Sequence, residues 1–185
     1  MEMSLDHKIN TVMDRATCLI DESSLNQILD QLAEQMGASL KDKHPLLLCV
    51  MRGGMMVTSE LTKRLPFKMQ VDYLHATRYQ GQMQGAQLEW KHKPGISLKD
   101  RVVVLVDDIL DGGVTLAEIK AFCEAQGAKQ VQTAVLLDKK AMRHPKGLKV
   151  ADFVGIEIEN HFVFGFGLDY YEHYRNLPAI YQVDE

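Results

Sequence analysis

The sequence predicts an α/β fold in which a mostly parallel, twisted sheet is flanked by helices. Three apolar runs of strand length occur at residues 46–50, 102–106 and 131–137. Segments with the apolar spacing of helices follow the first two runs, and a glycine-containing turn precedes each of these segments. A helix between two strands returns the chain to the start of the next strand, so the strands pair in parallel.

The first predicted element is a helix over residues 23–40. Its apolar residues recur at intervals of three and four, which places them on one helical face. The sequence Ser24-Leu25-Asn26-Gln27 resembles a capping box and marks the helix start. The apolar face consists of Leu25, Ile28, Leu29, Leu32, Met36 and Leu40.

The run at residues 46–50 predicts a buried strand that ends at the turn Met51-Arg52-Gly53-Gly54. A helix over residues 55–64 follows, and Pro66 ends it because proline cannot continue a helix. Residues 69–79 and 88–92 predict two extended segments. Residues 80–87 between them are rich in glycine and glutamine, which indicates a hairpin with a long tip.

The β-branched run at residues 102–106 is typical of a strand that is buried on both faces. A helix is expected from Thr115, with Gly127 as its stop. The run at residues 131–137 then completes a unit with the proportions of a right-handed β-α-β crossover. The face that this helix is expected to bury contains Leu116, Ile119, Ala121, Phe122 and Ala125.

The 185 residues suit a single domain. We expect its core at about residues 44–155 and a small hood subdomain from about residues 1–20 and 156–185. The carboxy-terminal third is rich in aromatic residues and glycine, which predicts a lid beside the sheet.

Composition narrows the class of partner. The net charge of −4 disfavours nucleic acid as a partner, since phosphate backbones are bound through clustered lysine and arginine. No apolar run is long enough to span a bilayer, so no membrane partner is expected. Cys18, Cys49 and Cys123 are isolated and odd in number, which favours a reducing cytoplasm over a disulfide framework.

The residues that follow the run at 102–106 predict a binding site. Asp107 and Asp108 come first, and Asp111-Gly112-Gly113-Val114-Thr115 precedes the helix. Amides at a helix start hold phosphate, and glycine lets it approach closely. Carboxylates accept hydrogen bonds from vicinal hydroxyls or bind Mg2+. The expected ligand therefore carries both hydroxyls and phosphate, as a ribose 5-phosphate group does.

Other types of phosphate and metal site are disfavoured. Three neighbouring acids repel one another unless cations or hydroxyls balance them. The cluster therefore favours a ligand-binding site over acids that only cap the following helix. The chain lacks G-x-x-x-x-G-K-[ST], G-x-G-x-x-G and H-E-x-x-H, and its acids lack the spacing of an aspartyl-phosphate phosphatase.

Residues 102–115, VVVLVDDILDGGVT, resemble the phosphoribosyl pyrophosphate loop of type I phosphoribosyltransferases. Residues 136–140, 152–158 and 162–175 resemble the hypoxanthine-guanine branch of that family. The resemblance implies the type I phosphoribosyltransferase fold and a purine salvage enzyme. This enzyme would transfer 5-phosphoribose from phosphoribosyl pyrophosphate to hypoxanthine or guanine, with Mg2+, and would form a homodimer or homotetramer.

The resemblance also implies roles for single residues at the sugar phosphate. Asp107 and Asp108 would contact the ribose hydroxyls and the metal. Asp111 would be the catalytic proton acceptor near N7 of the purine. The 5-phosphate would be enclosed by Asp111, Gly112, Gly113, Val114 and Thr115.

Pyrophosphate would contact Arg52, Gly53 and Arg175, and in this family the turn at Met51-Arg52 can contain a cis peptide. At the base, Lys139 would donate to O6 of the purine and Phe162 would stack on the ring. Carbonyls near Val163 and Asp169 would contact the other ring edge, and Asp169 would help to bind a second Mg2+.

The chain departs from many relatives at three places. Gly112-Gly113 replaces Thr-Gly, and Val114 replaces lysine, so we expect the 5-phosphate to depend more on backbone amides. Arg78-Tyr79 replaces Ser-Tyr in the lid hairpin. We expect Arg78 to supply charge to pyrophosphate when the lid closes.

Two alternatives remain. The chemistry could be the same with xanthine as a main acceptor, because xanthine also carries O6, whereas Lys139 with Phe162 disfavours adenine and pyrimidines. The second alternative is an RNA-binding regulator on the same fold, which would need a basic face that the acidic balance disfavours.

Overall fold

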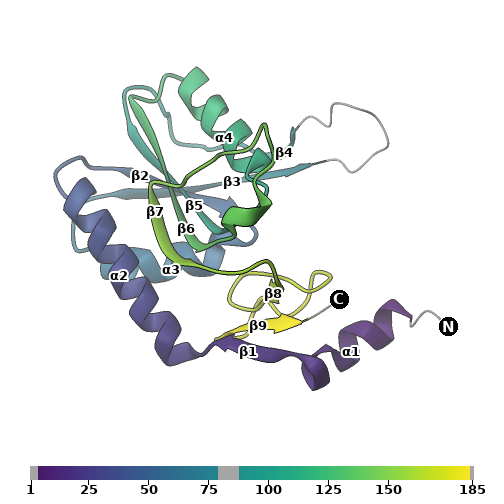
Figure 1. Cartoon of the computed structure of the whole chain (residues 1–185). Coiled ribbons are helices and arrows are strands. Elements are labelled where there is room, and N and C mark those ends of the chain that lie inside the picture. Colours follow the sequence, from purple (N-terminus) through teal and green to yellow (C-terminus); the bar gives the residue numbers. More distant parts are fainter. Residues whose placement is uncertain (1–3, 79–87, 184–185) are drawn as a thin grey trace.

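The computed structural model describes residues 4–78 and 88–183, which form two sheets. The large sheet has six strands in the order β4-β3-β2-β5-β6-β7, and the small sheet has three in the order β1-β9-β8 (Figure 1). In the large sheet only β4 is antiparallel to its neighbour. The predicted α/β fold is therefore confirmed. The large-sheet strands are β2 (Leu46–Met51), β3 (Gln70–Arg78), β4 (Leu88–His92), β5 (Val102–Leu110), β6 (Gln130–Asp138) and β7 (Phe153–Glu157).

Helices cover both faces of the large sheet. α2 (Glu22–Leu40) and α3 (Gly54–Arg64) pack on one face, and α4 (Val114–Ala125) packs on the other (Figure 1). Alternate residues of β5 pack into the two hydrophobic cores on either side of the sheet. Val104 and Val106 face the core beneath α2 and α3, whereas Val103 and Leu105 face the core beneath α4. The strand is thus buried on both faces, as its β-branched run predicts.

Three local predictions differ from the structure. The N-cap of α2 is Asp21, whose carboxylate accepts from the Ser24 amide at 2.7 Å, so the capping box at Ser24 is wrong. α4 begins one residue before Thr115, and its Ala121 and Ala125 are exposed, while Cys123 is buried instead. Gly127, with φ of 83°, follows the end of this helix as predicted.

β5 extends further than the apolar run suggests. Its pairing with β6 continues through Asp107 and ends where Leu110 pairs with Asp138. The strand is therefore longer than the apolar run at residues 102–106, because the hydrogen-bonded partner strand continues alongside the acidic residues. Asp107 and Asp108 lie within the strand.

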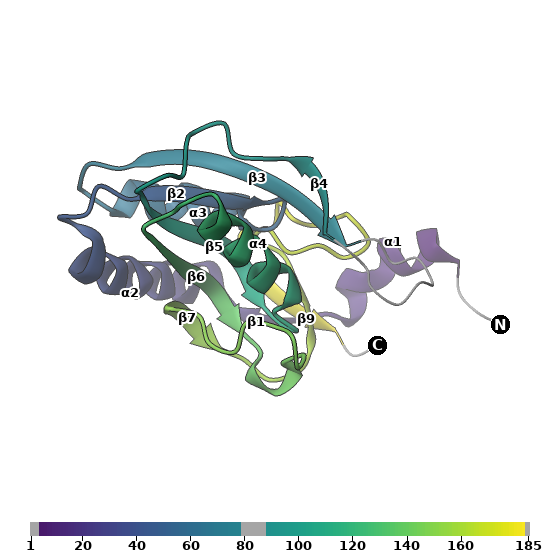
Figure 2. The same cartoon turned by 90° about the horizontal axis from the view of Figure 1, so that it is seen from above.

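The small sheet joins the two ends of the described chain. It contains β1 (Thr17–Ile20), β8 (Phe162–Phe164) and β9 (Ile180–Val183), and β9 lies between the other two. Figure 1 shows the small sheet below the large sheet, and Figure 2 shows α1 (Leu5–Arg15) on the side toward which β3 runs. The helix and strand before residue 20 were not predicted. The two sheets support the division into core and hood, which stays a prediction.

Two further predictions concern the edge of the large sheet and the membrane. The hairpin of β3 and β4 is confirmed, while its expected tip at residues 80–87 lies outside the described residues. Among the helices at residues 4–78 and 88–183, none is long and apolar enough to cross a membrane.

Candidate active site

A cavity of about 740 Å³ opens at the carboxyl ends of β2 and β5. The chain continues from β2 to β3 on one side and from β5 to β6 on the other. These connections leave in opposite directions, and ligands of open α/β sheets bind in the crevice between them. The cavity is lined by the ends of both strands, by residues 111–115, by the start of α4 and by residues 142–145.

The acidic pair of β5 lies in this lining. Asp108 is 9% exposed, and the Asp107 carboxylate accepts from the Asp108 amide at 3.0 Å. Burial and the neighbouring charge of Asp108 raise the pKa of Asp107 well above its usual range. Burial also raises the pKa of Asp108, although the charge of Arg175 opposes this effect. A ligand that brings hydroxyls or a cation would stabilise the ionised pair.

The turn after β2 lies directly against this pair. A Cβ atom on Gly53 would stand 1.8 Å from Oδ2 of Asp108, so the carboxylate occupies the space that only glycine leaves free. The carbonyl of Gly53 in turn lies 2.3 Å from the position of a Cβ on Gly167. The peptide bond between Met51 and Arg52 is cis. Three segments far apart in sequence therefore meet at Gly53.

The loop at residues 111–115, here called the phosphate loop, begins α4. Gly113 is the N-cap residue, with φ of 75°, and its carbonyl accepts from the Ala117 amide at 3.0 Å. Within the described residues, the amides of Gly112, Gly113, Val114 and Thr115 have no hydrogen-bond acceptor. The first amides of a helix have no partner inside it and attract anions. This loop can therefore bind a phosphate group.

The predicted base-binding residues lie outside the cavity lining. Lys139 follows β6 and is 8% exposed, so it does not stand in solvent at a strand end. No hydrogen-bond or ion-pair partner for its ammonium occurs among the described residues. Phe162 is 38% exposed and lies edge to face with Tyr170 at 5.6 Å, whereas Val163 is buried. An exposed ring can stack on a base, and the ammonium of a largely buried lysine can donate to a carbonyl.

The predicted pyrophosphate residues form an ion-pair network. Arg175 pairs with Asp169 at 2.7 Å and donates to the Gly167 carbonyl at 2.7 Å. Glu172 lies between the two arginines, 2.7 Å from Arg52 and 3.5 Å from Arg175. Two arginines at one end of the sheet can bind an anion with several oxygens.

Some predicted residues lie together and others do not. Arg78 ends β3, but its side chain and the whole of Tyr79 lie outside the described residues, so the lid contacts stay predictions. The predicted residues that line the cavity are Asp107, Asp108, Asp111, Gly112, Gly113, Val114 and Thr115.

Sequence reasoning missed one group of cavity-lining residues. Met142, Arg143 and His144 line the cavity, and the fact that they follow a strand next to β5 could have indicated this. His75 pairs with Met51 in the sheet but does not line the cavity. Burial, followed by the charges of Arg52 and Lys91, lowers the pKa of His75, so it is neutral near pH 7.

The residues present fit a magnesium ion only in part. Asp107 and Asp108 supply adjacent carboxylates, and Mg2+ is often bound through one or two carboxylates together with substrate phosphates. Asp169 is engaged by Arg175 and by the Glu172 amide at 2.8 Å. Within residues 4–78 and 88–183, no three His, Cys, Asp or Glu side chains form a cluster that could hold a metal ion without a substrate.

Comparison with known proteins gives consistent similarities. The family described as "Phosphoribosyl transferase domain" matches residues 20–171. The chain is 33% identical to a hypoxanthine-guanine phosphoribosyltransferase of Lactococcus lactis, covering 97% of this chain and 94% of that protein. A crystal structure of a hypoxanthine phosphoribosyltransferase from Staphylococcus aureus is 30% identical, with a TM-score of 0.87, covering 95% of this chain and 96% of that chain.

A further relative is much longer. The chain is 32% identical to the bifunctional protein TilS/HprT of Listeria innocua, over 88% of this chain. The chain spans 25% of the length of that bifunctional protein.

Proposed function

The chain belongs to the phosphoribosyltransferase family, in its hypoxanthine-guanine branch, and we propose that it is a purine salvage enzyme. It transfers 5-phosphoribose from phosphoribosyl pyrophosphate to hypoxanthine or guanine and forms IMP or GMP with release of pyrophosphate. One observation carries this proposal: an acidic pair and a helix start with free amides line the same cavity. This cavity lies between β2 and β5, where the chain connections leave in opposite directions.

The sugar phosphate occupies the cavity. The amides of Gly112, Gly113, Val114 and Thr115 bind the 5-phosphate, since they have no acceptor among the described residues. Asp107 and Asp108 accept hydrogen bonds from the ribose hydroxyls, which replace the water that burial removes. Their raised pKa values favour this assignment, because hydroxyl donors and cations stabilise the ionised form of the pair.

In the reaction the sugar becomes cationic while negative charge grows on the leaving pyrophosphate. The carboxylates of β5 stabilise the sugar, and Arg52, Gly53 and Arg175 bind pyrophosphate. Asp111, which lines the same cavity, accepts the proton from N7 of the purine. Mg2+, held by Asp107 and Asp108 with Asp169 nearby for a second ion, would supply further positive charge to the pyrophosphate oxygens.

The acceptor is selected at the base site. The Lys139 ammonium donates to O6 of the purine, and an adenine amino group cannot accept that bond. Phe162 stacks on the ring, and the carbonyls near Val163 and Asp169 contact its other edge. Xanthine carries O6 as well, so it stays an alternative main acceptor.

The remaining parts of the proposal concern surroundings and assembly. Met55, Val71 and Tyr73 are apolar and 43%, 48% and 44% exposed, and all three line one groove beside α3 and β3. This groove supports a homodimer or homotetramer. The free state of Cys18, Cys49 and Cys123 supports a cytoplasmic location.

The decisive experiment is a panel of five purine and pyrimidine bases, each with phosphoribosyl pyrophosphate and Mg2+, followed by measurement of pyrophosphate release. Activity with 6-oxopurines alone supports the proposal, and the ratio of rates ranks hypoxanthine, guanine and xanthine. A gel-shift assay with RNA beside this panel tests the regulator alternative. RNA binding without turnover would overturn the enzyme assignment.

A further inference from the structure

Arg143 holds the phosphate loop from behind, through a set of contacts that the predicted site does not include. One of its terminal nitrogens donates to the carbonyls of Leu110 at 2.8 Å, Asp111 at 2.6 Å and Lys139 at 3.1 Å. Its Nε donates to the Lys149 carbonyl at 3.1 Å. The other terminal nitrogen pairs with the Asp138 carboxylate, whose side chain is 2% exposed. Arg143 itself is 11% exposed.

These contacts occupy all three nitrogens of the guanidinium group. A guanidinium has five N–H donors in a rigid fork, and its acceptors here are protein groups. Arg143 therefore lines the cavity while protein acceptors hold each of its nitrogens. These contacts connect the end of β5 to the end of β6, including the backbone of Lys139.

The residues after Arg143 continue the same set of contacts. Residues 140–149, here called the support loop, donate to the next two carbonyls of the phosphate loop. The His144 amide donates to Gly112 at 3.0 Å, and the Leu148 amide donates to Gly113 at 2.9 Å. A Cβ on Gly147 would lie 2.0 Å from the Gly112 carbonyl oxygen, so the two loops are in close contact.

This arrangement fixes the direction of the phosphate-loop amides. In a trans peptide, the carbonyl of one residue and the amide of the next point in opposite directions. The carbonyls of Asp111, Gly112 and Gly113 all accept from the support loop. The amides of Gly112, Gly113 and Val114 therefore point away from it, as three donors available to an anion.

We propose that Arg143 is the positioning residue of the 5-phosphate site: by holding the Asp111 carbonyl and the support loop, it orients the amides that bind the phosphate. The inference rests on the proposed function. The orientation of the amides matters especially in this chain, because Gly112 and Val114 supply no hydroxyl or ammonium to the phosphate. Binding then depends on how the amides are aimed.

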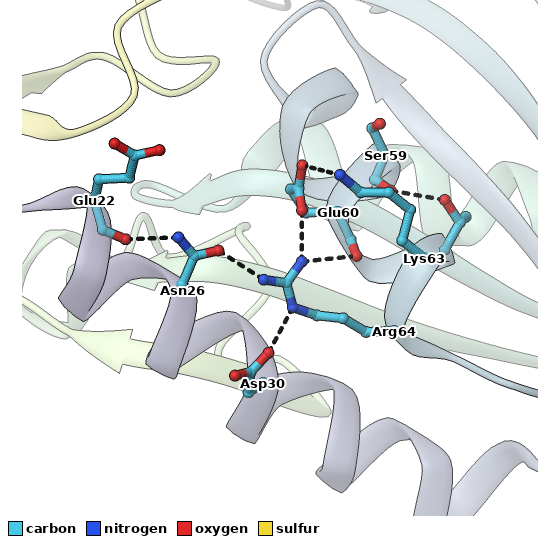
Figure 3. A network of polar contacts seen from close by, with 8 residues as sticks. Glu22, Asn26, Asp30, Ser59, Glu60, Lys63 and Arg64 are labelled. Atoms are coloured by element: carbon cyan, nitrogen blue, oxygen red, sulfur yellow. Dashed lines mark hydrogen bonds and ion pairs between the residues drawn. The ribbon is translucent and has the colours of Figure 1, made fainter.

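Arg64 provides a matched control, since it is a comparably engaged arginine away from the cavity. It donates to Asp30 at 2.7 Å and Asn26 at 2.7 Å on α2, and to Glu60 at 2.5 Å on α3 (Figure 3). Its side chain is 19% exposed, and neither it nor these partners line the cavity. Replacing it disturbs a similar network without touching the phosphate loop.

The test compares Arg143→Lys with Arg64→Lys. Lysine keeps the charge but lacks the fork, so it cannot reach the same set of acceptors. Binding of ribose 5-phosphate and of IMP is measured by calorimetry, with melting temperature and steady-state kinetics. We expect Arg143→Lys to weaken ribose 5-phosphate binding by at least about tenfold and to raise KM for phosphoribosyl pyrophosphate. Arg64→Lys should lower the melting temperature and leave both values within about twofold of wild type.

Gly147→Ala is a second variant that tests the direction of the amides while the Arg143 guanidinium stays intact. It can also be measured if Arg143→Lys does not fold. Its Cβ displaces the Gly112 carbonyl, and the same loss of ribose 5-phosphate affinity is expected. Wild-type affinity in folded Arg143→Lys overturns the role of Arg143. Wild-type affinity in folded Gly147→Ala overturns the link between carbonyl position and amide direction on which that role rests, and both outcomes leave the enzyme assignment untouched. A wild-type chain that neither binds ribose 5-phosphate nor turns over any base overturns both.

Discussion

Replacing Gly53 with alanine tests the contact between the turn after β2 and the acidic pair. The backbone of Gly53 has φ of −61° and ψ of −42°, which alanine adopts without strain. The new Cβ, however, would stand 1.8 Å from Oδ2 of Asp108, whereas ordinary contact begins near 3.4 Å. The carboxylate must therefore move by about 1.6 Å. A displacement of about 1 Å in a catalytic geometry can cost about 100-fold in rate, so we expect kcat/KM to fall at least that far.

Gly37→Ala is the matched control for this substitution. Gly37 lies in α2, and a Cβ there meets nothing within 4 Å. Alanine in a helix is more stable than glycine by about 0.5–1 kcal/mol, so this variant should gain stability and keep full activity.

Steady-state turnover at varied phosphoribosyl pyrophosphate, with melting curves, measures both variants. A double variant then isolates the cause, because Gly53→Ala should have little further effect once Asp108→Ala has removed the carboxylate. Activity of Gly53→Ala within about threefold of wild type, in a folded protein, would refute the reasoning. Full additivity in the double variant would show that Gly53 acts through another group.

The other predictions concern single side chains of the site. Asp111→Asn should still bind IMP in calorimetry but lose about 10² to 10⁴ in turnover, and near-normal turnover would remove Asp111 as the base. The folded-state pKa of Asp107 is raised above 3.8, so stability of the ligand-free protein should fall as pH rises from 3.8 through that raised pKa. Asp107→Asn should flatten this melting profile, and an unchanged profile would contradict it. Lys139→Met should weaken IMP binding by at least about tenfold without loss of stability, while Lys140→Met, at an exposed position, should leave binding unchanged. Arg78→Ala should raise KM for phosphoribosyl pyrophosphate, and unchanged kinetics would end its proposed lid role.

The large sheet follows from the sequence because its central strands have a strong local signal. Residues 46–50 and 102–106 are apolar enough that only a strand buried on both faces accommodates them, and both are confirmed. Where the outcome depends on a distant partner, local reasoning fails. The end of β5 is set by pairing with β6, and nothing within residues 107–110 indicates that pairing.

The candidate site divides in the same way. The acidic pair and the phosphate loop are contiguous in sequence, so one pattern predicts all of them, and they do line one cavity. The support loop has no such pattern. Arg143 acts on the phosphate loop through carbonyls more than 30 residues away, and only the packing of β5 beside β6 brings them together. The place of the base-binding residues depends on the small sheet, whose strands come from both ends of the described chain.

The position of β9 between β1 and β8 also has a consequence for the order of assembly during synthesis. β2, β5 and β6, with the phosphate loop, can pair once residues 46–138 have left the ribosome. The small sheet has no central strand until residues 180–183 emerge, and β1 must wait for a partner about 160 residues later in the chain. The proposed sugar-phosphate half of the site therefore precedes the small-sheet residues that are proposed to contact the base. A nascent chain stalled after the support loop but before residue 180 would hold a formed phosphate loop beside an incomplete small sheet.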